Sequence, residues 1–261
     1  MIDATDEAAA RLRHSARYRV RFDEAGPDGL LRTSNLLRYA QDVGWRHSEA
    51  LGLDRAWYDA RGLAWVVRAA ELEIVEPVPI GVELEVRTEV VGYQRIWARR
   101  RAECRLPDGR LAAWVHTDWV MIDGRGRLVR VPAEIHERFP APVLTEALLR
   151  VPVPAPPPDA ATHGLVVRPH ELDPMNHPNN AVYVDWLEET LLMAGDPAAG
   201  LVSSRPRLYR LEYAAAAGAG STVAAAAWPA DHGWMVRLAG PNDEVLLRAT
   251  AGPGVPDRGV R

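Results

Sequence analysis

Lysine is absent from this sequence of 261 residues, so all 31 basic side chains are arginines. Without lysine, the chain has neither a Schiff-base residue nor the phosphate-binding lysine of a Walker loop. Cysteine is represented by Cys104 alone, which excludes an intrachain disulfide framework and gives no sign of secretion. We therefore expect a protein of a reducing compartment, the cytoplasm.

Long apolar runs and an excess of positive charge are also missing. No run approaches the roughly 18 to 20 apolar residues that a spanning helix needs, and the N-terminal segment lacks an apolar signal-peptide core. The formal net charge is −4 and the pI is near 6.1, whereas general nucleic-acid-binding proteins are typically basic. We expect neither a membrane nor a nucleic acid as a partner.

Proline, in contrast, is concentrated in one segment. Seven prolines lie between Phe139 and Ala161, where they interrupt helices and sheet ladders and favour an extended connector. This segment predicts two domains, residues 1–139 and 162–261, joined by a linker at residues 140–161.

The two parts repeat one order of elements. Each begins with a strand pattern, around Tyr18, Val20 and Phe22 in the first part and at residues 165–168 in the second. A turn rich in Gly, Pro or Asp follows. Next comes a helix with apolar residues on more than one face, which indicates a helix largely enclosed by protein. Ser34 is the expected N-cap of the first helix.

Each helix is followed by strand patterns. The helices are expected within residues 33–52 and 179–195, ending at Gly52 and Gly195. Four antiparallel strands then follow in each part, joined by short turns such as that at 107–109. An antiparallel sheet wrapped around a central helix is the hotdog arrangement. Its repetition after about 140 residues predicts a tandem (double) hotdog of the α+β class.

The densest group of reactive side chains lies directly before the second helix: Asp173, Asn176, His177, Asn179 and Asn180. His177 is the natural general base because neutral imidazole titrates near physiological pH, and Asp173 can orient it or help to activate water. Free main-chain amides from Asn179 onward, with the helix dipole, can form an oxyanion hole. Local spacing leaves open a second interpretation, in which the asparagines are helix caps and the histidine is structural.

The same segment resembles the second hotdog domain of the fatty acyl-carrier-protein (acyl-ACP) thioesterases. The resemblance rests on Asp173, His177, Asn179, Asn180 and Tyr183, followed by Trp186 and Glu189. Residues 114–123 and 129–135 and the first helix are similar to the first domain of that family, so the likeness runs from about Tyr18 to Ala251.

The resemblance implies an enzyme of fatty acid biosynthesis. It would hydrolyse fatty acyl thioesters of ACP or coenzyme A to free fatty acids, with no cofactor and no metal. The first domain would line the acyl pocket, and a homodimer of the double-hotdog chain is the candidate assembly.

Two positions depart from the family pattern. Met175 stands where plant members have asparagine, and Asn176 is displaced by one position. After the Leu-Glu-Tyr strand at residues 211–213, Ala216 occupies the expected position of the family's glutamate. Because a general base typically contributes 10²–10⁴-fold to a rate, an acyl-thioester-binding protein without catalysis is one alternative. Asp173 is the candidate substitute for the missing carboxylate.

A hotdog hydratase or dehydratase is the other alternative, but Asp173 and His177 lie one residue closer together than in those enzymes. Glu188 and Glu189, further along the helix, are expected to be solvated or structural acids. The first domain lacks the reactive set: Leu31, Thr33, Asn35 and Leu36 are expected where the second has Met175, His177, Asn179 and Asn180.

Overall fold

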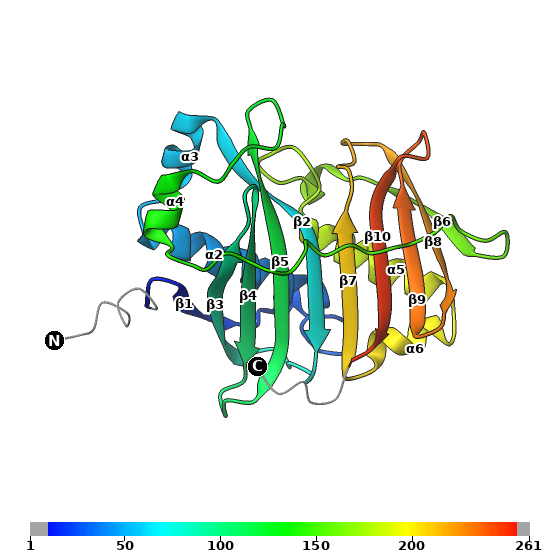
Figure 1. The fold of residues 1–261 in the computed structure, drawn as a ribbon. Helices are drawn as coiled ribbons and strands as arrows, with labels where there is room; N and C mark the ends of the chain where they lie inside the picture. The colour runs from blue at the N-terminus through cyan, green and yellow to red at the C-terminus, as the bar shows by residue number, and fades with distance from the viewer. Residues whose placement is uncertain (1–9, 255–261) are drawn as a thin grey trace. The chain divides into compact units, whose positions relative to one another are not determined.

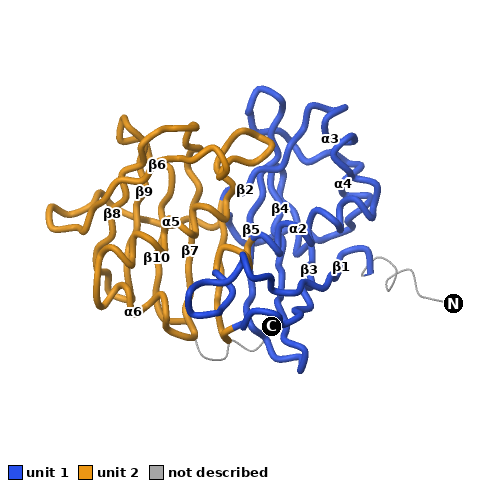
Figure 2. Tube along the Cα trace, turned by 180° about the vertical axis from the view of Figure 1, so that it is seen from behind, with its two compact units in different colours: residues 1–32, 38–68, 78–148 blue, residues 33–37, 69–77, 149–261 orange. Residues whose placement is uncertain are grey.

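The computed structural model of the protein describes residues 10–254. The chain divides into two compact units, which are coloured separately in Figure 2. Unit 1 contains Met1–Arg32, Arg38–Arg68 and Val78–Leu148, and unit 2 contains Thr33–Leu37, Ala69–Pro77 and Leu149–Arg261. The chain therefore crosses between the units several times, and two short segments of the expected first domain belong to unit 2.

Unit 1 is an antiparallel sheet with one long helix. Its strands lie in the order β1 (Arg13–Arg19), β3 (Glu83–Tyr93), β4 (Trp97–Arg105), β5 (Leu111–Asp123) and the first half of β2 (Leu63–Ile74). Its helical elements are η1 (Phe22–Glu24), most of α2 (Thr33–Ala50), α3 (Arg55–Arg61) and α4 (Ala133–Arg138). The long helix α2 lies behind the strands in Figure 1. Burial alternates along β1 and β3, as the sequence periodicity predicts.

Unit 2 repeats this arrangement. The second half of β2 is followed by β7 (Arg207–Tyr213), β10 (Val245–Pro253), β9 (Gly233–Ala239), β8 (Thr222–Ala230) and β6 (Ala161–Val166). Its helical elements are η2 (Pro169–Glu171), α5 (Asn180–Met193) and α6 (Ala198–Ser203). The helix α5 packs against β6, β8 and β9. Both units are thus sheets around a central helix, which confirms the predicted hotdog fold.

The sequence of α5 suits this enclosed position. Eight of its residues are buried: Ala181, Val182, Tyr183, Val184, Trp186, Leu187, Thr190 and Leu191. The only polar one, Thr190, returns its hydroxyl to the Trp186 carbonyl at 2.6 Å, so the enclosed helix leaves no hydroxyl unpaired at this point. The helix ends before Gly195, whose φ of 75° is the left-handed conformation expected of a C-terminal glycine. No helix of the described part is both long and apolar enough to cross a membrane.

The predicted first strand is wrong at its end. Phe22 is 88% exposed and lies in η1, outside β1. The chain leaves the strand because the Glu24 carboxylate accepts a hydrogen bond from the Arg21 amide at 2.9 Å and so closes a turn. Alternation of apolar residues alone does not reveal this local side-chain bond.

The predicted N-cap of α2 is also wrong. The helix begins at Thr33, and its N-cap is Arg32, whose side chain makes no capping bond. Ser34 lies inside the first turn and is fully buried. The Arg32 amide is instead bound to the Glu24 carbonyl at 3.0 Å, which sets the start of the helix. Gly52, with φ of 74°, ends the helix as predicted.

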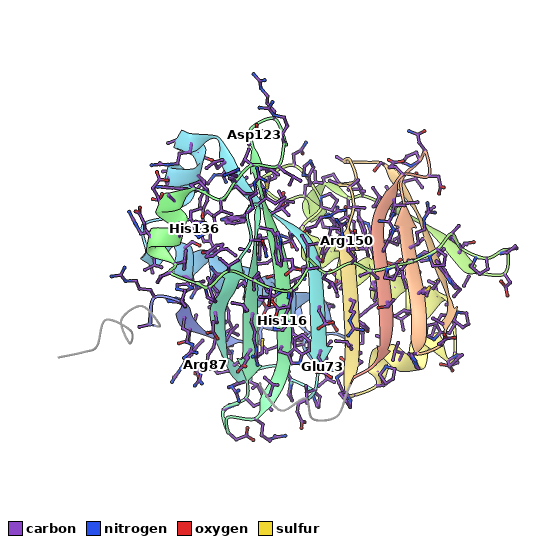
Figure 3. The ribbon with its side chains drawn as sticks, in the orientation of Figure 1. Glu73, Arg87, His116, Asp123, His136 and Arg150 are labelled. Carbon is purple, nitrogen blue, oxygen red and sulfur yellow. The ribbon has the colours of Figure 1, made fainter. Side chains whose placement is uncertain are left out.

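The proline-rich segment is extended and is held by side chains of the strands. In unit 1, Arg99 on β4 donates to the Ala147 carbonyl at 3.2 Å. In unit 2, the buried carboxylate of Glu212 on β7 accepts hydrogen bonds from Arg150 Nη1 at 2.7 Å and from the Val151 amide at 2.9 Å. Figure 3 labels Arg150 on this segment. Its path is therefore fixed by specific bonds as well as by its prolines.

The interior of unit 1 contains a buried histidine in a defined tautomer. Arg100 donates from Nη1 to Nδ1 of His47 at 3.0 Å, so the proton of the ring is on Nε2, which lies 3.0 Å from the Arg11 carbonyl. His47 is 2% exposed. Burial and the neighbouring Arg100 lower the pKa of His47 from 6.5 to about 3. The imidazole therefore stays neutral when the protein is folded.

This depressed pKa predicts acid sensitivity. Below pH 6.5 the unfolded chain takes up a proton at His47 that the folded chain does not, so the folded state loses about 1.4 kcal/mol per pH unit until the pH nears 3. The His47→Gln variant lacks this titration. Urea unfolding at about pH 6.5 and about pH 5.5 should show the parent losing roughly 1 kcal/mol more than the variant, because the unfolded histidine is already half protonated at the upper pH. Equal losses in both proteins would contradict the assignment.

Candidate active site

A tight turn precedes α5 and contains most of the predicted reactive residues. The Asp173 amide donates to the His177 carbonyl at 2.8 Å, and the Asn176 amide donates to the Asp173 carbonyl at 2.9 Å. Oδ1 of Asp173 accepts hydrogen bonds from the amides of Met175 at 2.8 Å and, more weakly, of His177 at 3.5 Å. Asn176 has φ of 60°, a left-handed conformation that asparagine tolerates well. The turn thus brings Asp173 and His177 to one place.

The first residues of α5 follow directly. Asn179 is the N-cap, and its Oδ1 accepts a hydrogen bond from the Ala181 amide at 2.9 Å. The amide of Asn179 itself donates to the Glu171 carbonyl at 3.0 Å. Asn180 is the first helical residue, and its amide has no acceptor among residues 10–254. The expected set of main-chain donors therefore narrows to Asn180, next to the positive end of the helix dipole.

The side chains of the turn are open to solvent to different degrees. His177 and Asn176 are exposed, and Asp173 is half-buried. The His177 imidazole has no hydrogen-bond partner in the described part of the chain, so Asp173 does not hold the ring in this structure. Only Oδ1 of Asp173 is used by the turn, which leaves Oδ2 open to a water molecule or to the imidazole.

Two tyrosines hold the start of α5 in place. The sequence analysis did not identify them as a pair. Tyr213 on β7 donates from its hydroxyl to the Asn180 carbonyl at 3.1 Å. The Tyr183 hydroxyl accepts a hydrogen bond from the Ala217 amide at 3.2 Å. Burial, with a smaller contribution from the nearby Asp173 charge, raises the pKa of Tyr183. The loop that carries Ala216 is therefore anchored beside the start of α5, and Ala216 is exposed there.

Two other carboxylates are committed elsewhere. Glu212, in the Leu-Glu-Tyr motif on β7, binds Arg150 and Val151 of the linker. Glu188 on α5 pairs with Arg207 at 3.1 Å. Neither acid is a partner of His177, so Asp173 is the acid that the structure places next to this histidine.

The first half of the chain contains a matching turn. Its bridge joins Ala25 and Leu31, as Leu172 and Pro178 are joined in the second half. Both turns have a left-handed residue at the fourth position, Gly29 in one and Asn176 in the other. In both, the residue before the helix donates its amide to a glutamate carbonyl at 3.0 Å, from Arg32 to Glu24 and from Asn179 to Glu171.

These hydrogen bonds show that the predicted correspondence between the turns of the two halves was wrong by three positions. Asp173, His177, Asn179 and Asn180 match Gly26, Leu30, Arg32 and Thr33. The earlier alignment was wrong because the helix periodicity alone does not fix where the turn begins. The first half still lacks both the acid and the histidine at these positions.

The first part of the chain matches a known protein family. Residues 11–139 match the family described as "Acyl-ACP thioesterase N-terminal domain". Over this part of its length the chain matches the acyl-ACP thioesterase family. A curated relative is acyl-(acyl-carrier-protein) hydrolase FATB2, chloroplastic, of Cuphea viscosissima, which is 24% identical over 192 residues.

Solved structures of acyl-ACP thioesterases share the fold. The acyl-ACP thioesterase from Bacteroides thetaiotaomicron has a TM-score of 0.78 at 16% identity, covering 94% of this chain and 98% of its own. The 12:0-ACP thioesterase from Umbellularia californica has a TM-score of 0.76 at 21% identity, covering 92% and 96%. The tandem hotdog architecture is thus that of the acyl-ACP thioesterase structures over nearly the whole chain.

The coverage of the curated relative is smaller. The FATB2 alignment includes 66% of this chain and 46% of the relative, so the chain spans about half the length of the curated acyl-ACP thioesterases that it matches. A second relative, FATB3 of the same plant, is covered to 45%.

Proposed function

We propose that this protein is an acyl thioesterase that hydrolyses fatty acyl thioesters of ACP or coenzyme A to free fatty acids in the cytoplasm. The observation that carries the proposal is the turn before α5, which places Asp173, His177 and the open Asn180 amide within eight residues. The match of residues 11–139 to the acyl-ACP thioesterase N-terminal domain supports the same chemistry.

In the proposed reaction, a water molecule attacks the thioester carbonyl. The neutral His177 imidazole, or Oδ2 of Asp173, accepts a proton from the water as the new C–O bond forms. The developing oxyanion is stabilised by the Asn180 amide and the positive end of the α5 dipole. The tetrahedral intermediate collapses when the C–S bond breaks, and the thiolate takes up a proton from the protonated base.

Two tyrosines support this arrangement without reacting. Tyr213 fixes the carbonyl of Asn180, and Tyr183 fixes the loop at Ala217. Because both tyrosines are buried, they hold the first turn of α5 in one position relative to β7. A donor held in advance is worth more to a developing charge than one that must reorient.

A second candidate function follows from Ala216. The family's glutamate would lie near this position, and the alanine there is exposed beside a loop without an acid at residues 214–217. If Asp173 does not replace the missing carboxylate, the protein binds acyl thioesters without hydrolysing them. We rank catalysis first because the Asp173 carboxylate retains an open oxygen next to His177.

Thioester hydrolysis by the purified protein tests the proposal. Acyl-ACP and acyl-coenzyme A substrates of several chain lengths should be compared, with release of thiol and of free fatty acid measured together. Turnover on one carrier or both supports the thioesterase. A folded protein that binds acyl thioesters but turns none over would support the non-catalytic alternative.

The variant Ala216→Glu tests the role of the missing carboxylate. It restores an acid beside the start of α5, so we expect kcat to rise by at least about tenfold, which is below the 10²–10⁴-fold contribution of a well-positioned general base. Ala219→Glu, an exposed position on the same loop, is the matched control and should not change kcat. If Ala216→Glu has no effect either, the base comes from Asp173 or His177 without a further carboxylate.

A further inference from the structure

The strand β4 carries three consecutive arginines, and the middle one has no acidic partner. Arg99 pairs with Asp118, and Arg101 pairs with Glu103. The Arg100 guanidinium points inside unit 1, where burial lowers its pKa from 12.5 to about 10. No aspartate or glutamate of the described part of the chain contributes to its environment.

The bonds of Arg100 use only one end of the guanidinium. Nη1 donates to His47 Nδ1 at 3.0 Å and to Thr88 Oγ1 at 3.2 Å. Nε and Nη2, with the remaining three of the five N–H groups, have no acceptor among residues 10–254. The Nε–Nη2 edge is one of those that grip the two oxygens of a carboxylate in a bidentate pair.

The Arg100 side chain packs against a glycine in α2, and a glycine at that position lowers the stability of the helix. Gly44 lies in the middle of α2, where glycine disfavours a helix, and a Cβ there would be 3.1 Å from Cδ of Arg100. The ring of Phe139 lies 5.6 Å from the guanidinium carbon. Helix α2 and strand β4 thus pack around the Arg100 guanidinium, whose positive charge no acidic side chain described in unit 1 neutralises.

The surroundings are apolar and aromatic. Tyr58 and Tyr93 lie close enough for their phenols to influence the pKa of Arg100. The same cluster of buried side chains contains Leu53, Val90, Ala98, Met121, Val131, Ile135 and Phe139. Arg100 keeps part of its surface accessible although it is strongly desolvated. Arg100 is therefore a half-buried cation in apolar surroundings.

We propose that Arg100, with His47 and Thr88 holding its Nη1, is a carboxylate-binding site within unit 1 for a monocarboxylate with an apolar body. The Nε–Nη2 edge binds the two carboxylate oxygens, and the aromatic side chains around it contact the apolar body. This site belongs to unit 1, the proposed catalytic turn belongs to unit 2, and the site does not depend on the proposed function.

Calorimetric titration with octanoate tests the site, and 1-octanol serves as the uncharged probe of the same length. We expect saturable binding of octanoate that is at least about tenfold tighter than that of 1-octanol. The variant Arg100→Met should lose this preference while its affinity for 1-octanol is kept. Arg87→Met, which removes an exposed cation on β3, should bind like the parent.

Two further variants make the outcome decisive. Arg100→Lys keeps a charge but lacks the planar fork, and it should lose most of the octanoate affinity if it folds where Arg100→Met does not. His177→Ala should bind octanoate like the parent, so failure of catalysis and failure of this site are distinguishable. Octanoate binding that is unchanged in folded Arg100 variants, or absent from the parent, would overturn the proposal.

Discussion

Replacement of His177 by alanine is expected to lower kcat for acyl-thioester hydrolysis by about 10²–10⁴-fold. The imidazole is exposed and makes no hydrogen bond within the described residues, so its loss removes a base without removing a contact. Thermal stability should therefore stay the same. Steady-state kinetics and a melting curve on the same preparation measure both effects, and His170→Ala, another exposed histidine of this segment, is the control.

Two variants of Asp173 separate the effect of its charge from the effect of its hydrogen bonds. Asp173→Asn retains an oxygen that can accept from the Met175 amide, whereas Asp173→Ala does not. If the charge activates water or orients His177, both variants lose activity, and only Asp173→Ala also loses stability. Asp28 holds the matching turn of the first half through the Leu30 amide at 3.0 Å, so Asp28→Asn should leave hydrolysis unchanged.

A fully active Asp173→Asn variant would show that the carboxylate only shapes the turn. His177 would then act as the base without an acidic partner. A fully active His177→Ala variant would show that the histidine is not the base, because Asp173 is then the titratable side chain of the turn that remains to accept the proton. If neither His177→Ala nor Asp173→Asn lowers activity, the proposed catalytic turn would be abandoned.

The largest expected effect on stability is at Glu188. Its Oε1 accepts hydrogen bonds from Thr33 at 2.6 Å, from Tyr209 at 3.0 Å and from Arg207 at 3.1 Å. Arg207 is 3% exposed. Truncation in Glu188→Ala leaves the guanidinium without its carboxylate in unit 2, which is expected to cost about 3–5 kcal/mol.

Urea unfolding of four proteins measures this effect: the parent, Glu188→Ala, Arg207→Met and the double variant. The double variant is expected to be more stable than the sum of the single losses predicts, because it leaves no unpaired charge. Glu189→Ala, at the exposed neighbouring position, should change the free energy of unfolding by less than about 0.5 kcal/mol. A loss below about 1 kcal/mol in Glu188→Ala would show that water replaces the pair.

The partners of Glu188 could not be predicted from the sequence. Glu188 was expected to be a solvated or structural acid, and the structure shows the second. The network joins three elements, because Thr33 starts α2, Arg207 and Tyr209 lie on β7 and Glu188 is on α5. Thr33 is 155 residues from Glu188, and no periodic pattern joins positions that far apart.

The fold and the position of the turn, in contrast, are local properties. The enclosed helix α5 follows from apolar residues on more than one face, and its end follows from Gly195. The turn follows from a short segment with Asp, Pro and Asn before that helix, since each of these residues favours a turn or cap by its own backbone preference. Such preferences act between near neighbours and can be read without a structure.

The sequence by itself determined that the chain is a tandem hotdog and that its reactive residues gather before the second helix. The tertiary structure decided which carboxylates remain available to act beside His177. Glu212 is bound to the linker and Glu188 to Arg207, which leaves Asp173 beside His177. It also decided that the half-buried Arg100 has no acidic partner among the described residues. Pairing of charges depends on distances in space, and only the packed strands and helices set those distances.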